Sequence, residues 1–358
     1  MISRVSVIST MQQSPITSPH LSVKQDTGAI MRLVLLATLP GVATLTWFFG
    51  WGTVINIIWA SLVAAGTEAL VLKLRKRPVG FYLRDYSALV TAFLLAISIP
   101  PYAPWWLLLV GVAVAIIIAK HLYGGMGYNP FNPAMVGYVV LLISFPIEMT
   151  RWAAPSGSVA NQAALLGPLD ALYASFPWFT SQSIDAFTMA TPLDVFKQNN
   201  TQLVSELWGS EPQFGAFGGR GWEWVNVAFL GGGLFLLYKR IFTWHAPISM
   251  LIALTLMAAL FYDGGSAASK GSPLFHLFTG ATMLGAFFIV TDPVSSAVSN
   301  RGRLIYGASV GVLMFLIRNY GDYPDAVAFA VLLMNFAAPL IDYYTQPRTY
   351  GHDRSARK

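Results

Sequence analysis

The chain has 358 residues, of which 55% are hydrophobic and only 11% are charged. Soluble domains are about 25% charged on average, so this composition excludes a disordered chain, a nucleic-acid-binding domain and an ordinary cytosolic enzyme. The absence of cysteine excludes disulfides, thiolate metal sites, iron–sulfur ligation and cysteine nucleophiles. The formal net charge is +6, but the basic residues cluster at the ends of long apolar runs, which is typical of an integral membrane protein.

Ten apolar runs follow a polar N-terminal segment, residues 1–29, that has no feature of a cleavable signal peptide. A helix needs about 20 apolar residues to cross the hydrocarbon core. Some runs are shorter, so one or two broken helices are expected. The sequence predicts an all-α polytopic membrane protein with about ten transmembrane helices. The runs are Ile30–Gly50, Gly52–Leu72, Tyr86–Ile99, Trp105–His121, Asn132–Ile147, Trp224–Tyr238, Trp244–Tyr262, Leu274–Val290, Leu304–Leu316 and Ala326–Tyr344.

The basic residues also predict the orientation of these helices. With a cytoplasmic N-terminus and ten spans, 17 of the 22 lysines and arginines fall on the cytoplasmic side, where positive charge is retained. Both termini are then cytoplasmic, including the tail 345–358. The long polar segment 148–223 lies outside, and a loop of this length in a compact protein favours a functional role.

The two halves of the chain share a weak internal pattern. Lys120 and Arg318 close runs that are 198 residues apart, and Pro100 and Pro293 close runs that are 193 apart. Two five-helix repeats, 30–147 and 224–344, would be inverted relative to each other because five is an odd number of spans. The alternative is that basic, aromatic, Gly and Pro residues are simply common at span ends.

One segment of the outer loop, residues 185–193, combines a carboxylate, two hydroxyls and a proline. Asp185 precedes Thr188 by three residues and Thr191 by six, and Pro192 follows directly. From the residue types alone, this pattern indicates a turn or a threonine-capped helix start.

The same segment resembles the flavinylation motif, in which an acid and a Ser or Thr precede an Ala-Thr pair. The resemblance implies that Thr191 carries FMN through a phosphoester, with Asp185 and Thr188 as recognition positions, and that an external flavin transferase attaches the flavin. Met189 stands where many versions of the motif have Gly.

Further segments resemble one family along almost the whole chain, roughly residues 15–350. They are Ser18–His20, Gly124–Ala134 and Thr291–Ser295. Together with the ten runs they are similar to the D-type subunits (RnfD) of Rnf complexes. The B-type subunits (NqrB) of the sodium-translocating NADH:quinone reductases are also similar, but they usually have a longer N-terminal extension. The resemblance implies a bacterial inner-membrane location.

The segment Gly124–Ala134 holds three glycines and two prolines between apolar runs, so its backbone cannot remain helical. Asn129 and Asn132 offer amide donors and acceptors to a ring system. The family resemblance implies that this region lies near a non-covalent riboflavin. A plain cytoplasmic reverse turn is the alternative.

Few ionisable residues lie inside the apolar runs, and each is a functional candidate because charge is costly at membrane depth. Asp292 follows the eighth run and is the first candidate for ion coupling, since broken helix ends can coordinate cations. Glu68 is the second, unless Lys73 merely pairs with it at a helix end. His276 is expected at the interface rather than on a metal. Gly231–Gly233 are expected to serve close helix packing.

The resemblance therefore implies a membrane electron-transfer subunit of an ion-translocating ferredoxin:NAD oxidoreductase, which is inactive without its partner subunits. It would carry covalent FMN and couple electron flow to cation movement. Two alternatives remain open: the quinone-reductase relative, and a secondary transporter without a cofactor.

Overall fold

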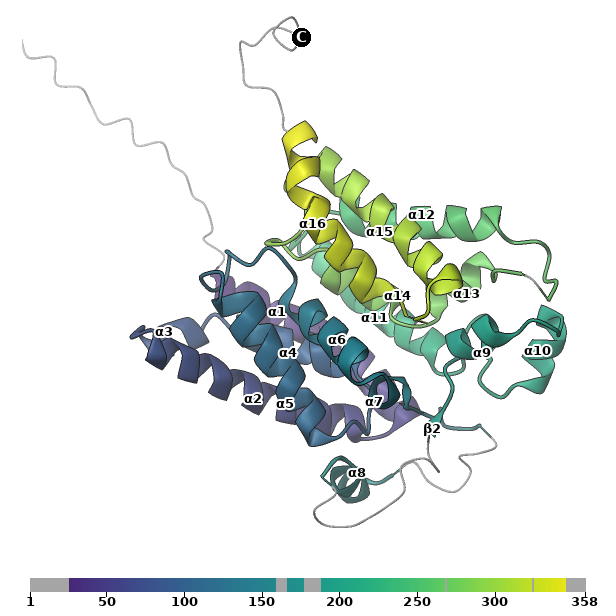
Figure 1. The fold of residues 1–358 in the computed structure, drawn as a ribbon, viewed down its shortest axis with the longest axis horizontal. Helices are drawn as coiled ribbons and strands as arrows, with labels where there is room; N and C mark the ends of the chain where they lie inside the picture. Colours follow the sequence, from purple (N-terminus) through teal and green to yellow (C-terminus); the bar gives the residue numbers. More distant parts are fainter. Residues whose placement is uncertain (1–25, 159–165, 177–187, 268, 324, 346–358) are drawn as a thin grey trace, which may run out of the picture.

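Each of the ten apolar runs forms helix in the computed structural model, which describes residues 26–158, 166–176, 188–267, 269–323 and 325–345 (Figure 1). The helices of the first half are α1 (Thr27–Phe49), α2 (Gly52–Leu74), α3 (Val79–Leu83), α4 (Ser87–Ser98), α5 (Trp105–Ala113), the π-helical segment η1 (Val114–His121), α6 (Pro133–Ser144) and α7 (Pro146–Thr150). The sequence did not predict that the fourth run would end in the π-helical segment η1.

The helices of the second half include one broken run. They are α11 (Trp222–Tyr238), α12 (His245–Leu260), α13 (Pro273–Phe278), α14 (Thr282–Leu284), the π-helical segment η4 (Gly285–Ile289), α15 (Asn300–Tyr320) and α16 (Val327–Thr345). The eighth run is divided between α13, α14 and η4, which confirms the expectation of a broken helix. The ninth run was predicted too short, because α15 extends beyond the apolar residues at both ends.

The connection between the halves is built from short elements. They are β1 (Trp152–Ala153), α8 (Pro168–Ser175), β2 (Thr188–Met189), α9 (Pro192–Gln198) and α10 (Val204–Ser210). The two strands pair antiparallel, with Trp152 opposite Met189 and Ala153 opposite Thr188. This ladder is a small exception to the all-α prediction.

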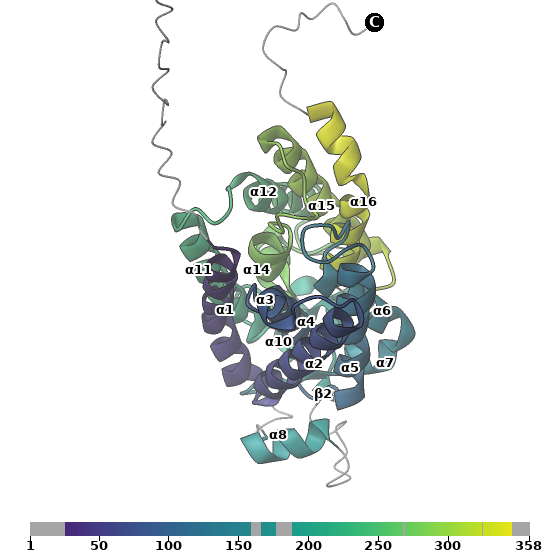
Figure 2. The ribbon, with the colours of Figure 1, turned by 90° about the vertical axis from the view of Figure 1, so that its left-hand side faces the viewer.

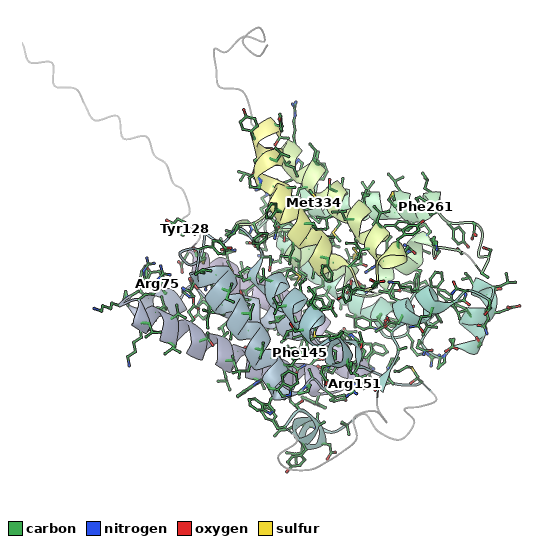
Figure 3. All side chains as sticks on the ribbon, in the orientation of Figure 1. Arg75, Tyr128, Phe145, Arg151, Phe261 and Met334 are labelled. Atoms are coloured by element: carbon green, nitrogen blue, oxygen red, sulfur yellow. The ribbon has the colours of Figure 1, made fainter. Side chains whose placement is uncertain are left out.

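The two halves pack through matching helices. The first helices of the halves, α1 and α11, contact each other, as do the last helices, α6 and α16. Figure 2 shows α1 beside α11. The side chains of Arg75 and Tyr128 lie at one end of the first half, and that of Arg151 lies at the other end (Figure 3).

Two neighbouring glycines of α11 allow close packing, one against α1 and the other against η4. A Cβ atom added to Gly232 would lie 2.1 Å from the backbone oxygen of Ala37, and one added to Gly233 would lie 2.3 Å from the ring of Phe287. Gly231 faces open space instead. The prediction of a packing role is therefore confirmed for two of the three glycines.

Three of the described helices are long and apolar enough to cross a membrane by themselves: α1, α2 and α16. Four shorter apolar helical stretches accompany them: Ser87–Ser98, Trp105–His121, Pro133–Ser144 and His245–Leu260. Together, they define a helical membrane protein.

Candidate functional site

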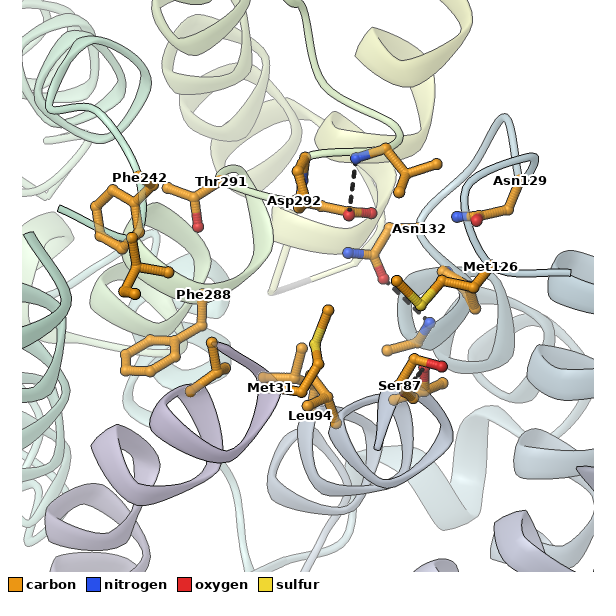
Figure 4. A pocket seen from close by; sticks show the side chains of 18 of the residues that line it. Met31, Ser87, Leu94, Met126, Asn129, Asn132, Phe242, Phe288, Thr291 and Asp292 are labelled. Carbon is orange, nitrogen blue, oxygen red and sulfur yellow. Dashed lines mark hydrogen bonds between the residues drawn. The ribbon is translucent and has the colours of Figure 1, made fainter. Parts of the chain in front are cut away.

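A large pocket lies between the two halves, next to the glycine-rich segment 124–134; we call it the glycine-loop pocket (Figure 4). Its volume is about 870 Å³, its open mouth included. The wall is mostly apolar and comes from α1, α4, α11 and η4, with residues such as Met31, Leu94 and Phe288. Apolar walls with a few polar groups are typical of cofactor sites.

Both predicted asparagines line this pocket, and both are buried. The Asn132 Oδ1 atom caps α6 by accepting from the backbone N–H groups of Ala134 and Met135, at 3.0 and 3.3 Å. Its amide nitrogen points into the pocket (Figure 4). The Asn129 Nδ2 atom donates to the carbonyl of Phe131 at 3.0 Å, which stabilises the loop itself. Asn132 is therefore the more available donor for a ligand.

The loop that carries these asparagines is an irregular turn, as its composition predicts. Gly124, Gly125 and Gly127 have φ angles of 130°, 114° and 88°. Residues other than glycine rarely adopt such backbone conformations. The loop thus closes one side of the pocket without continuing the helix.

Asp292 also lines the pocket, three residues after the end of η4. Its carboxylate accepts from the Ser295 hydroxyl at 2.7 Å and from the Val294 backbone N–H at 3.2 Å. Its own backbone carbonyl accepts from the Ser296 hydroxyl at 2.6 Å. The carboxylate is therefore held at the edge of the pocket by the turn that follows it.

Glu68 does not pair with Lys73, the partner that sequence spacing suggested. Its Oε1 atom accepts from Lys120 Nζ at 2.5 Å and lies 3.2 Å from His121 Nε2. Side chains five apart on a helix lie on different faces, whereas η1 packs against α2 and brings Lys120 to Glu68. All three side chains are buried, and Lys120 also lines the glycine-loop pocket.

Thr191 begins helix α9 as its N-cap residue. Its hydroxyl donates to Asp194 Oδ2 at 2.6 Å, and the Asp194 backbone N–H donates back to the hydroxyl at 3.2 Å. The capped helix start that the residue types indicated is confirmed. Burial raises the pKa of Asp194, although hydrogen bonds from Thr191 oppose that shift.

A second pocket, the Thr191 pocket, lies beside this helix start and has a volume of about 500 Å³, its mouth included. Thr191, Asp194 and two tryptophans line it. The rings of Trp152 and Trp222 meet edge to face, with centroids 4.8 Å apart. The Thr191 hydroxyl and the flat rings of Trp152 and Trp222 thus line the same pocket.

The surrounding elements fix the position of Thr191. The β1–β2 ladder holds Thr188, which is partly buried, three residues before it. On the other side, Lys197 donates to the carbonyls of Gly321 and Tyr323 at the end of α15. The other predicted recognition residue, Asp185, lies outside the described residues.

A buried arginine lies close to the Thr191 pocket. Arg318 donates to the carbonyl of His276 at 2.9 Å and to the Thr282 hydroxyl at 3.0 Å, and it lies 3.6 Å from Asp325. These contacts bridge the break between α13 and α14. His276 is only 2% exposed, so its ring packs inside the protein.

Sequence reasoning missed Lys120, Ser87 and Asp194 as site residues. Lys120 was treated as a charge at a helix end, although a lysine within an apolar run is itself a signal. Asp194 follows Thr191 by three residues, which is the spacing of a capping box. Nothing in the local sequence distinguishes Ser87 from other span-end serines.

The described helices define a multi-helix membrane protein with two ligand-sized sites. One is the glycine-loop pocket between the halves, and the other is the Thr191 pocket at a capped helix start. Residues 15–351 match the family described as NQR2, RnfD, RnfE. The chain therefore belongs to this family.

Several relatives match the chain almost from end to end. The D-type subunit of the ion-translocating oxidoreductase complex from Cellvibrio japonicus is 59% identical over 345 residues, which cover 96% of each chain. The Pseudomonas aeruginosa protein of the same name is 60% identical, covering 95% of this chain and 96% of its own. A Salmonella paratyphi A protein, which also has this name, is 52% identical, with 94% and 97% covered.

Proposed function

We propose that this chain is the D-type subunit of an ion-translocating oxidoreductase complex and acts there as a flavin-bearing electron-transfer protein. The family match and the relatives of the same name support the first part. The observation that carries the second part is the Thr191 hydroxyl, which lies at a helix start and on the wall of an aromatic-lined pocket.

Thr191 is the proposed attachment point for FMN through a phosphoester, and this would make the chain a phosphoprotein in the chemical sense. The Thr191 pocket fits such a group, since Trp152 and Trp222 offer flat surfaces to an isoalloxazine. A tether replaces a binding equilibrium by a high effective concentration. The flavin supplies the redox chemistry, and the chain positions it. Thr188 and Asp185 are the proposed recognition positions for the flavin transferase.

The glycine-loop pocket is the proposed site of a non-covalent riboflavin. Its apolar walls fit the ring, and the free Asn132 amide fits a carbonyl or a ring nitrogen. Asn129 supports that wall through its bond to Phe131. The two pockets would then place two flavins at different ends of one protein.

For the membrane arrangement, we propose ten spans in two inverted five-helix repeats, 30–147 and 224–344. Support comes from matching contacts: Lys120 donates to the Ser87 hydroxyl at 2.7 Å, and Arg318 donates to the Thr282 hydroxyl at 3.0 Å. In each repeat, a cation on the fourth run thus reaches a hydroxyl on the third. Both termini, with segment 1–29 and tail 345–358, would be cytoplasmic, and 148–223 would be a periplasmic loop of an inner-membrane protein.

We further propose that electron flow, from ferredoxin to NAD through partner subunits, drives a cation across the membrane. Asp292 and Glu68 are the ion-coupling candidates. Asp292 presents a carboxylate at the edge of the glycine-loop pocket. Moving one charge against 100 mV costs about 2.3 kcal/mol, a scale that a flavin redox step supplies.

Fluorescence on a denaturing gel tests the covalent flavin. The chain purified from a host that has the flavin transferase should fluoresce after denaturation, and Thr191→Ala should abolish the signal. Thr201→Ala is the matched control, because this threonine is exposed in the same loop and should leave the signal intact. Fluorescence retained in Thr191→Ala would place the linkage elsewhere. A colourless wild-type chain would favour a cofactor-free transporter.

A further inference from the structure

A chain of buried polar side chains runs along the edge of the glycine-loop pocket. Lys120 Nζ donates to Glu68 Oε1 at 2.5 Å and to Ser87 Oγ at 2.7 Å. The Ser87 hydroxyl in turn donates to Asp85 Oδ1 at 2.6 Å. Each link is a short hydrogen bond between groups that can give or accept a proton. His121 extends the chain on the far side of Glu68.

The two ends of this chain reach different environments. Asp85 precedes α4 and is only partly buried, so water reaches its carboxylate. Ser87 and Lys120 both lie on the wall of the glycine-loop pocket. The hydrogen bonds therefore connect a solvent-accessible carboxylate to an ammonium group that faces the pocket.

The cluster also has unused proton-binding capacity. Among the described residues, neither Glu68 Oε2 nor His121 Nδ1 has a hydrogen-bond partner, although both atoms are buried. A buried pair that served only for stability would be expected to satisfy such atoms. Two open acceptor positions beside a lysine are instead consistent with a site where protons move.

We propose that Asp85, Ser87 and Lys120 form a proton relay into the glycine-loop pocket, with Glu68 as the counter-charge of Lys120. The relay rests on the proposed function, since it serves the flavin assigned to that pocket. An electron that enters this buried pocket adds a negative charge, and a proton taken up with it restores neutrality.

For each electron that a bound flavin accepted, Lys120 would supply one proton to the pocket and become a neutral amine. The Asp85 carboxylate, which accepts from the Ser87 hydroxyl at rest, takes a proton from water. The Ser87 hydroxyl then rotates towards the amine, gives it its own proton and takes the proton of Asp85. Lys120 is again an ammonium beside Glu68, Asp85 is again a carboxylate, and one proton has left the solvent.

Other charged groups face the same cluster and belong to its electrostatics. Arg75 on α2 donates to the carbonyl of His121 at 3.0 Å, and Arg32 on α1 lies over the ring of Tyr86, the neighbour of Ser87. Asp292 faces the pocket from the second half. None of these three lies between Asp85 and Lys120 in the hydrogen-bonded chain.

Ser87→Ala tests the relay with little structural damage, because Lys120 keeps its partner Glu68. Asp85→Asn is the second variant, since an amide still accepts from the Ser87 N–H but does not shuttle protons. Ser98→Ala is the matched control: this hydroxyl is on the same helix and bonds only its own turn, to the carbonyl of Leu94 at 2.8 Å.

The assay uses the full-length chain with Thr191→Ala as background, so that only pocket-bound flavin absorbs. Riboflavin is added where none co-purifies. Dithionite supplies the electrons and is oxidised to sulfite, and stopped-flow absorbance follows both the reduction of the flavin and the protonation of the reduced ring, which change its spectrum differently. The relay predicts that Ser87→Ala and Asp85→Asn slow this protonation at least tenfold and increase the solvent isotope effect in D₂O. Ser98→Ala should match the background.

The outcomes separate the two proposals. If riboflavin binds but both relay variants behave like Ser98→Ala, the relay is wrong and the flavin site stands. If riboflavin does not bind to the folded chain at all, the flavin site is wrong and the relay fails with it. Equal slowing by Ser98→Ala would show a general effect of α4 and would also refute the relay.

Discussion

The packing of α1 against α11 provides a sharp test of the fold, because two neighbouring glycines differ in their surroundings. We consider Gly232→Ala, with Gly231→Ala as its control. At Gly232 the new methyl group would lie 2.1 Å from the Ala37 carbonyl oxygen, whereas ordinary contacts begin at about 3.4 Å. That neighbour is backbone, so no side-chain rotation relieves the overlap. At Gly231 nothing lies within 4 Å.

The expected magnitudes follow from these distances. Alanine is favoured over glycine within a helix by about 1 kcal/mol, and both variants gain this term. Only Gly232→Ala must also separate two helices that pack against each other, and overpacking costs about 1–3 kcal/mol. The difference between the two variants is therefore expected to be about 1–3 kcal/mol, with Gly231→Ala the more stable.

The free energy of unfolding can be measured by SDS titration in mixed micelles, with helix content as the readout. Both variants should be compared with the wild-type chain at the same detergent ratio. If Gly232→Ala were as stable as Gly231→Ala, the close approach of α1 and α11 would be wrong. The proposed pairing of the two halves through their first helices would then lose its support.

Three further predictions concern charged groups. Lys120→Met leaves Glu68 buried without its cation and should lower stability by about 3–5 kcal/mol, whereas adding Glu68→Leu should recover much of the loss; thermal melting in detergent measures both. Arg318→Met should lower the melting temperature far more than Arg220→Met, because Arg318 is buried and bridges α13 and α14, whereas Arg220 donates to an exposed loop carbonyl. The third concerns Asp194, whose pKa is raised by burial, so that the folded state binds its proton more tightly. Stability should therefore fall as pH rises from 3.8 through the raised pKa. Asp194→Asn should flatten this pH dependence, which limited proteolysis of the loop measures.

The sequence predicts the helices well because a membrane span needs little more than continuous apolar length. Every predicted run corresponds to helix, and α2 begins at Gly52 as expected. The predicted bounds are wrong where polar residues extend a helix, as in α15. A broken helix was expected, but the hydropathy pattern does not place the break between α13 and α14. Hydropathy reports burial in lipid or protein, but it does not report hydrogen-bond geometry.

The candidate sites were predictable only where the pattern is local. The cap at Thr191 follows from residues within one turn, and Asn132 caps α6 in the same way. The partner of Glu68 was not predictable, because Lys120 is 52 residues away and reaches it through the packing of η1 on α2. Long-range contacts between charged side chains need the tertiary structure.

The two buried cations differ in a way that bears on mechanism. Lys120 and Arg318 hold similar places in the two halves, and each donates to a hydroxyl on the preceding run. A lysine ammonium can release its proton when its surroundings change, whereas a guanidinium stays charged. Two backbone carbonyls hold Arg318 in addition to the Thr282 hydroxyl and Asp325, whereas the hydroxyl that Lys120 contacts, Ser87, donates in turn to the partly buried Asp85. The proposed relay therefore has a cation that can release a proton beside the glycine-loop pocket, whereas the cation beside the Thr191 pocket cannot, so electron transfer between the proposed flavins would be linked to protons at one end only.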